Sequence, residues 1–173
     1  MGLVACFCLM LLVATTVIHY EVLRWLTAAL ALLRIEPRIK PRFKLVFVMV
    51  AAFGAHAAEI VLYGAAYYLL ATHLGRGSMG ETDILTFPRC LYFSAETFTS
   101  LGYGDVVPHG DLRLLAGMEA LNGLLLIGWT TSYTYISMER FWDAGKDGIR
   151  RDHETVNCGG QPARVPLPDE GTE

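Results

Sequence analysis

Three long, mostly apolar stretches constrain this chain more than any other feature: residues 2–18, 45–70 and 112–136. A helix rises 1.5 Å per residue, so about 20 residues cross a hydrocarbon core about 30 Å thick; the first stretch is marginal and the other two are long enough. Lipid offers no partners to backbone N–H and C=O groups, so a spanning segment folds as a helix. With 53% hydrophobic residues among 173, the sequence predicts an all-α membrane protein.

The N-terminal segment, residues 1–36, is predicted to supply one transmembrane or interfacial helix. Residues 2–18 carry no charge, and residues 20–34 repeat apolar side chains at helical spacing, away from Glu21 and Arg24. The second part forms either a helix in the membrane interface or the end of one long tilted helix over about 9–33, with Glu21 and Arg24 paired. Both alternatives leave one extra N-terminal transmembrane helix.

A basic segment over residues 34–44 follows, with five cations and one acid. The positive-inside rule places it in the cytoplasm, so the N-terminus is predicted outside, with residues 45–70 running outwards and the C-terminus cytoplasmic. Pro37 and Pro41 would break a helix here, which argues against a voltage sensor and favours a linker held on lipid headgroups.

A short apolar segment and the glycine pair Gly102 and Gly104 lie between the last two predicted spans. Thr86 and Pro88 are typical of a helix start, and the helix predicted over 87–99 is too short to cross a membrane. It can re-enter the membrane only where protein buries it, and the negative end of its dipole would favour a cation. Residues 74–81 are rich in glycine and indicate an extracellular loop.

This short helix leads into Ser100, Leu101, Gly102, Tyr103 and Gly104. A run of backbone carbonyls that points one way needs alternate residues in conformations that a β-carbon disfavours, and glycine reaches them readily. Rings of such oxygens, repeated around an axis, can replace the water shell of an ion. The Tyr103 ring would then point away from the ion and brace the loop, and the Ser100 hydroxyl would lie at the inner mouth.

At these residues the chain resembles the potassium-channel pore family, whose filter is usually Thr-Val-Gly-Tyr-Gly followed by Asp. The match runs from Ser100 to Asp105 and extends to Glu96, Thr97, Thr99 and Pro108, with Ser and Leu as departures at 100 and 101. The resemblance implies a homotetrameric, potassium-selective channel in the plasma (cytoplasmic) membrane. It implies K⁺ as the permeant ion at Ser100, Leu101, Gly102 and Tyr103, without an organic cofactor or enzyme activity.

The resemblance also implies an ion-channel pore domain over residues 37–142. Its parts are the outer helix 45–70, the pore helix 87–99, the filter 100–104 and the inner helix 111–138. The residues expected to support the filter are Tyr92, Phe93, Glu96, Thr97, Thr99 and Asp105. In some bacterial members of the family, carboxylates at the positions of Glu96 and Asp105 meet behind the filter. We expect this pair to control filter stability in a pH-sensitive way; the alternative is an exposed Asp105 and an ordinary local hydrogen bond at Glu96.

Glycines and intramembrane polar residues mark the predicted gating elements. Gly123 or Gly128 would let the inner helix bend, or else allow close helix packing. Four polar residues form a second group, predicted at nearly the same depth on the outer and inner helices: His56, Glu59, Glu119 and Asn122. We expect them to form a hydrogen-bonded cluster that is either a proton sensor or a static network.

The remaining features bear on partners and alternatives. Residues 143–173 are predicted to be a disordered cytoplasmic tail, and the four scattered cysteines predict neither a disulfide framework nor a metal site. The expected partners are other copies of the chain, membrane lipids and an unidentified regulatory partner bound through the N-terminal helix or the tail; a net charge of −3 gives no nucleic-acid signal. The alternatives are a weakly selective cation channel, a non-conducting channel-like scaffold, and a proton-linked membrane protein.

Overall fold

The computed structural model describes residues 2–35, 41–80 and 85–158. They form four helices: α1 (Gly2–Ile35), α2 (Pro41–Thr72), α3 (Phe87–Phe98) and α4 (Leu112–Cys158). The described residues contain no β-strand, and Met79 and Pro108 make one isolated bridge. Three of the helices are long and apolar enough to cross a membrane, over Gly2–Leu32, Arg42–Thr72 and Leu112–Glu139. The chain is therefore an all-α membrane protein, as predicted.

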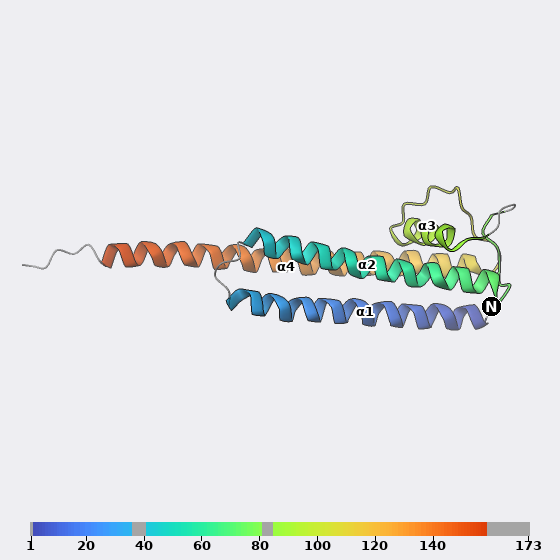
Figure 1. Ribbon diagram of the computed structural model, residues 1–173, viewed down its shortest axis with the longest axis horizontal. Coiled ribbons are helices and arrows are strands. Elements are labelled where there is room, and N and C mark those ends of the chain that lie inside the picture. The colour runs from blue at the N-terminus through green and yellow to red at the C-terminus, as the bar shows by residue number, and fades with distance from the viewer. Residues whose placement is uncertain (1, 36–40, 81–84, 159–173) are drawn as a thin grey trace, which may run out of the picture. The chain divides into compact units, whose positions relative to one another are not determined.

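The chain divides into two compact units, Met1–Ser137 and Met138–Glu173. In the first unit, α1, α2 and the first part of α4 run side by side, and the short α3 lies against one end (Figure 1). In the second unit, the described residues continue α4 to Cys158.

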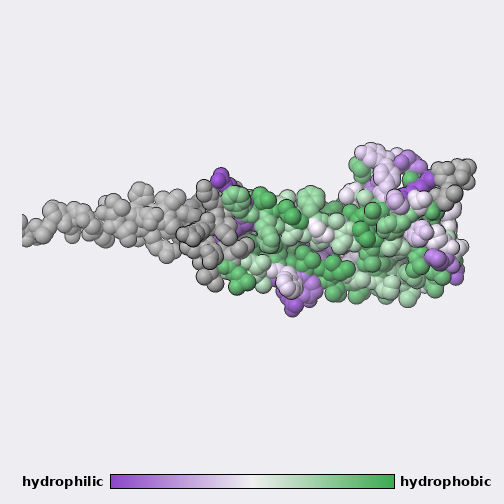
Figure 2. All heavy atoms as spheres, in the orientation of Figure 1, coloured by the Kyte–Doolittle hydropathy of each residue, from purple (hydrophilic) through white to green (hydrophobic). Residues whose placement is uncertain are grey.

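The surface of the first unit suits a bilayer. Large apolar side chains are exposed along the helices, including Leu9, Trp25, Leu32, Val50 and Phe53. Figure 2 shows this apolar surface along the helices, with hydrophilic residues gathered mainly around the α3 end. An exposed apolar surface of this extent is unusual for a soluble monomer and is typical of a lipid-facing one.

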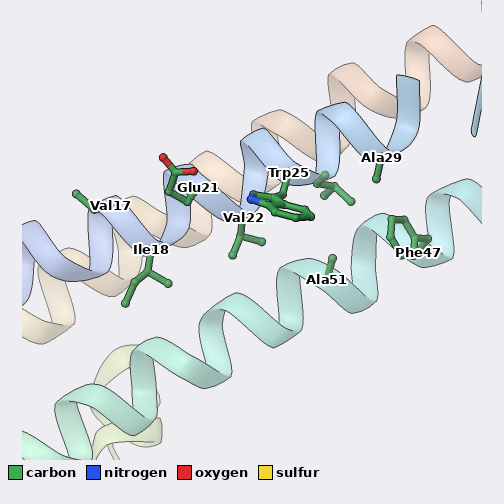
Figure 3. A pocket seen from close by; sticks show the side chains of 9 residues that line it. Val17, Ile18, Glu21, Val22, Trp25, Ala29, Phe47 and Ala51 are labelled. Atoms are coloured by element: carbon green, nitrogen blue, oxygen red, sulfur yellow. The ribbon is translucent and has the colours of Figure 1, made fainter. Parts of the chain in front are cut away.

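The N-terminal segment is the long single helix of the two alternatives. α1 has 34 residues and is roughly 51 Å long at 1.5 Å per residue. Arg24 and Glu21 form the predicted ion pair, with 2.8 Å between Nη2 and Oε2. Between α1 and α2, apolar side chains line a groove of about 510 Å³, in which Trp25 of α1 lies across from Ala51 and Phe47 of α2 (Figure 3).

The pore helix has nearly the predicted bounds. It begins at Phe87 after Thr86, whose backbone is extended (φ −116°, ψ 151°), and Pro88 lies in its first turn. The Thr86 hydroxyl makes no capping hydrogen bond, so proline geometry and packing set this helix start. Gly64 of α2 allows α3 to pack closely against α2, because a β-carbon at this position would lie 3.1 Å from the Leu91 Cα atom of α3.

The prediction for the tail is wrong over part of its length. The inner helix was expected to end at 138 and disorder to begin at 143, but α4 continues to Cys158. The physical reason is the position of the helix breakers: residues 139–158 contain no proline, whereas Gly159-Gly160 and the three tail prolines follow. Residues 159–173 lie outside the described part of the chain.

Candidate ion-conducting site

The predicted filter begins where α3 ends. Thr99 is the C-cap, and the backbone N–H of Leu101 donates to the Glu96 carbonyl at 2.8 Å. Positive φ angles then occur at every second residue: 57° at Ser100, 56° at Gly102 and 80° at Gly104. Left-handed residues that alternate with ordinary ones turn successive carbonyls towards one side. Sequence reasoning predicted this role for the two glycines and missed Ser100, which carries a β-carbon in the left-handed region.

The filter loop lies on the surface of the single chain. Ser100 to Asp105 are exposed, with 57% of Leu101 and 71% of Tyr103 accessible. The loop therefore exposes one apolar and one aromatic side chain on the surface of the single chain.

The residues predicted to support the filter are partly brought together. Phe93 and Glu96 are buried, Thr97 is half-buried, and the Thr99 hydroxyl donates to the Ala95 carbonyl at 2.7 Å. The Tyr92 side chain interacts with the carboxyl groups of both Glu96 and Asp105. The interaction with Glu96, then desolvation and the interaction with Asp105, raise the pKa of Tyr92 well above its usual value.

Glu96 is the buried member of the predicted carboxylate pair. Glu96 Oε1 has no hydrogen-bond partner among the described residues. Asp105 lies in the exposed loop, and Tyr92 interacts with both residues. A direct contact between Glu96 and Asp105 behind the filter stays a prediction.

We predict that Tyr92→Phe and Glu96→Ala each change the slow loss of current at the filter by several-fold, because each removes one partner of the interaction between these side chains. Single-channel open-state lifetimes measure the effect. Tyr68→Phe is the matched control, because Tyr68 packs its ring edge-on against Phe87 away from the filter. Open-state lifetimes that match the wild type in both variants would contradict a role for this interaction.

The two inner-helix glycines lie in different surroundings. A β-carbon on Gly123 would lie 2.1 Å from the Phe98 carbonyl oxygen, whereas a β-carbon on Gly128 would meet no atom within 4 Å. Gly123 therefore lets α4 lie against the end of the pore helix. For Gly123 this geometry favours close packing, and bending at either glycine stays a prediction.

The intramembrane polar residues form two groups, not one level. Glu59 contacts His19 Nδ1 at 2.9 Å and His56 Nδ1 at 3.0 Å. Glu119 instead accepts from Tyr67, which lies eight residues beyond Glu59 on α2, or about 12 Å further along it. Glu59 and Glu119 were predicted at one depth because the outer helix was assumed to enter the hydrocarbon core at residue 45 and the inner helix at residue 111. The outer helix, α2, instead runs from Pro41 to Thr72, so residue 45 does not mark where the core begins.

The second group joins all four helices. Asn122 Nδ2 donates to Thr15 Oγ1 at 2.8 Å and to the Tyr63 hydroxyl at 3.1 Å. Sequence reasoning missed the contribution of α1, although Thr15 and His19 are four residues apart on one face of an apolar helix. A histidine in a predicted span is by itself a reason to look for partners, and this signal was available.

Glu119 is held by two hydroxyl groups. Ser94 Oγ lies 2.5 Å from Glu119 Oε1 and 2.9 Å from the Ile60 carbonyl, and Tyr67 donates to Oε2. Ser94 has one hydrogen for two acceptors, so a protonated Glu119 that donates to Ser94 would satisfy both contacts. These contacts link α2, α3 and α4.

We predict that the free energy of unfolding of Glu119→Gln lies within about 1 kcal/mol of that of the wild type, because the glutamine amide can donate to Ser94 and accept from Tyr67. Glu119→Ala is expected to lose at least about 2 kcal/mol, since it leaves buried hydroxyl groups unpaired and a cavity. Thermal unfolding in detergent measures both variants. Equal destabilisation by Gln and Ala would show that the carboxyl group is ionised or that its contacts are unimportant.

A short helix and a loop with left-handed residues at 100, 102 and 104 lie between two helices long enough to span a membrane, as in the pore module of an ion channel. A family model described as "Ion channel" matches residues 45–140, more than half of the chain. The chain therefore belongs to this family, and its resemblance to potassium-channel pore domains is confirmed. It is a multi-pass membrane protein.

Among curated relatives, the chain is 32% identical over 80 residues to a calcium-gated potassium channel, TvoK, from Thermoplasma volcanium. The match covers 44% of this chain and 23% of the relative, so the chain spans under a quarter of that protein's length. No solved structure matches the chain.

Proposed function

We propose that this chain is one subunit of a potassium-selective channel that conducts K⁺ passively through Ser100–Gly104. The observation that carries the proposal is the alternation of left-handed residues at 100, 102 and 104, directly after the C-terminal end of a helix too short to span. Dehydrated ions move between successive rings of carbonyl oxygens, and the negative end of the α3 dipole favours a cation there. The Ser100 hydroxyl adds an oxygen at the inner mouth.

The channel is proposed to be a homotetramer. One loop supplies a single carbonyl at each level, so a ring of oxygens needs several copies around one axis. The exposure of Leu101 and Tyr103 in one chain supports this, because neighbouring copies would cover them. The copy number of four follows from the resemblance to potassium-channel pores.

The orientation follows from the basic segment between α1 and α2. Its cations favour the cytoplasmic side of the plasma membrane, which puts the filter loop at the outer face and the end of α4 in the cytoplasm. Cysteine labelling from one side tests this: Ser78→Cys in the exposed loop after α2 should react from outside with a membrane-impermeant maleimide. Reaction of this residue only from the inside would reverse the orientation.

The reversal potential between K⁺ on one side and Na⁺ on the other tests selectivity directly. A K⁺-selective filter moves it by about 59 mV for each tenfold preference for K⁺. A reversal potential near zero would instead identify a weakly selective cation channel and would direct attention to Ser100 and Leu101, where the filter departs from its usual residues.

A further inference from the structure

Two histidines and a glutamate meet between α1 and α2. His19 and Glu59 are fully buried and His56 is half-buried. One ligand-type atom from each residue lies within 4.8 Å of the other two. Trp129 of α4 packs over His19, with ring centroids 5.4 Å apart. The three side chains therefore converge in a site that is shielded from water on most sides.

Thr130 of α4 closes this group into a ring of contacts. Each histidine offers Nδ1 to Glu59 and Nε2 to the Thr130 hydroxyl, at 3.1 Å from His19 and 3.0 Å from His56. Each of the four contacts requires one hydrogen. An ionised Glu59, two neutral imidazoles and one hydroxyl supply three, so one imidazole nitrogen meets the hydroxyl oxygen without a hydrogen between them. The four contacts are thus one hydrogen short.

A metal ion at the Nδ1 side removes this deficit. Both imidazoles would then carry their hydrogen on Nε2 and donate to Thr130 Oγ1, which has two acceptor lone pairs. Such outer hydrogen bonds from metal-bound histidines fix the ring orientation and tautomer. In the usual zinc geometry, ligand atoms about 2.0–2.1 Å from the metal are roughly 3.3 Å apart. His19 Nδ1 lies 2.9 Å from Glu59 Oε1 and His56 Nδ1 lies 3.0 Å from Glu59 Oε2, so each histidine is a few tenths of an ångström closer than this to one oxygen of the carboxylate.

We propose that His19, His56 and Glu59 form a binding site for a divalent first-row transition metal ion such as Zn²⁺. Two imidazoles and one carboxylate suit this class, whereas K⁺, Mg²⁺ and Ca²⁺ prefer oxygen ligands, so the site is distinct from the conduction pathway. Three protein ligands leave a fourth position open for water or an anion. A bound ion would tie the N-terminal helix to the outer helix.

The site borders a cavity. His56 and Thr130 line a space of about 500 Å³ together with Phe98 and Thr99, the last residues before the filter. The His56 ring also contacts the Phe98 ring, with centroids 5.6 Å apart.

Cobalt is the probe for the test, because its visible absorption reports coordination. The parent for the test is the full chain with Cys158→Ser, so that the Cys158 thiol takes no metal. It is purified in detergent without a polyhistidine tag, and a chelator removes bound metal. We expect it to bind one Co²⁺ per chain, without the thiolate charge-transfer band, and to release it to Zn²⁺. His19→Gln should weaken binding by more than about 100-fold, since loss of outer-shell partners alone costs 10–100-fold.

His73→Gln is the matched control, because His73 is exposed and lies outside the cluster. It should bind Co²⁺ like the parent chain. Absence of Co²⁺ absorption in the parent chain, or full binding by His19→Gln, would overturn the proposal. Thermal unfolding gives a second readout that does not depend on any variant: Zn²⁺ should raise the unfolding temperature of the parent chain, and an unchanged temperature at saturating Zn²⁺ would also overturn it.

Discussion

Gly102→Ala is expected to abolish K⁺ conduction, leaving below about 1% of the wild-type flux per reconstituted channel. Gly102 has a φ of 56°, and an added β-carbon would meet no atom within 4 Å, so backbone conformation and not space is the obstacle. A left-handed conformation costs a residue with a β-carbon roughly 1–2 kcal/mol, or about 4–8 kcal/mol over the four copies of the proposed tetramer. In the proposed filter, the loop would relieve this strain by turning a carbonyl away from the ion, which would break one oxygen ring.

Gly75→Ala is the control for this prediction. Gly75 has a φ of 58° and equally open surroundings, but it lies in the loop after α2. It therefore imposes the same backbone strain outside the filter. We expect Gly75→Ala to lower stability slightly and to leave flux intact; a Gly102→Ala channel with wild-type flux and selectivity would exclude the proposed filter.

Gly123→Ala should have the second largest effect, a loss of stability with a loss of current. The added β-carbon would lie 2.1 Å from the Phe98 carbonyl oxygen and 2.9 Å from its carbon, and these backbone atoms cannot rotate away. α4 must then move from the end of the pore helix. Overpacking of this kind costs typically 1–3 kcal/mol, and here it recurs in every copy. Thermal unfolding in detergent and liposome flux measure the two effects.

Gly128→Ala is the matched control on the same helix. Its added β-carbon would meet no atom within 4 Å, and alanine favours a helix by about 1 kcal/mol over glycine. We expect stability equal to or above that of the wild type. If Gly123 acted only as a bend, Gly123→Ala would change the open probability without lowering the unfolding temperature, and the packing role would be wrong.

The spans and the pore helix were predictable from the sequence because they depend on local properties. Length and hydropathy are read from the chain itself, and Pro88 and the filter glycines fix backbone geometry at their own positions. The short helix predicted over 87–99 accordingly runs from Phe87 to Phe98. Residues 139–158 were misjudged because polar composition was weighed above the absence of proline.

The partners of the intramembrane polar residues were not predictable in the same way. His56 and Glu59 share a helix, so their contact follows from a spacing of three residues. The contact of Glu59 with His19 joins residues 40 positions apart and depends on how α1 packs against α2. Depth counting placed Glu59 and Glu119 together because it ignored the full length of α2. The role of the cluster in sensing protons stays a prediction.

The most direct test of the filter is ion flux through the purified chain in liposomes. The proposal predicts K⁺ flux far above Na⁺ flux, with block by external Ba²⁺, a divalent ion close to K⁺ in size. Equal K⁺ and Na⁺ flux without block by Ba²⁺ would contradict it.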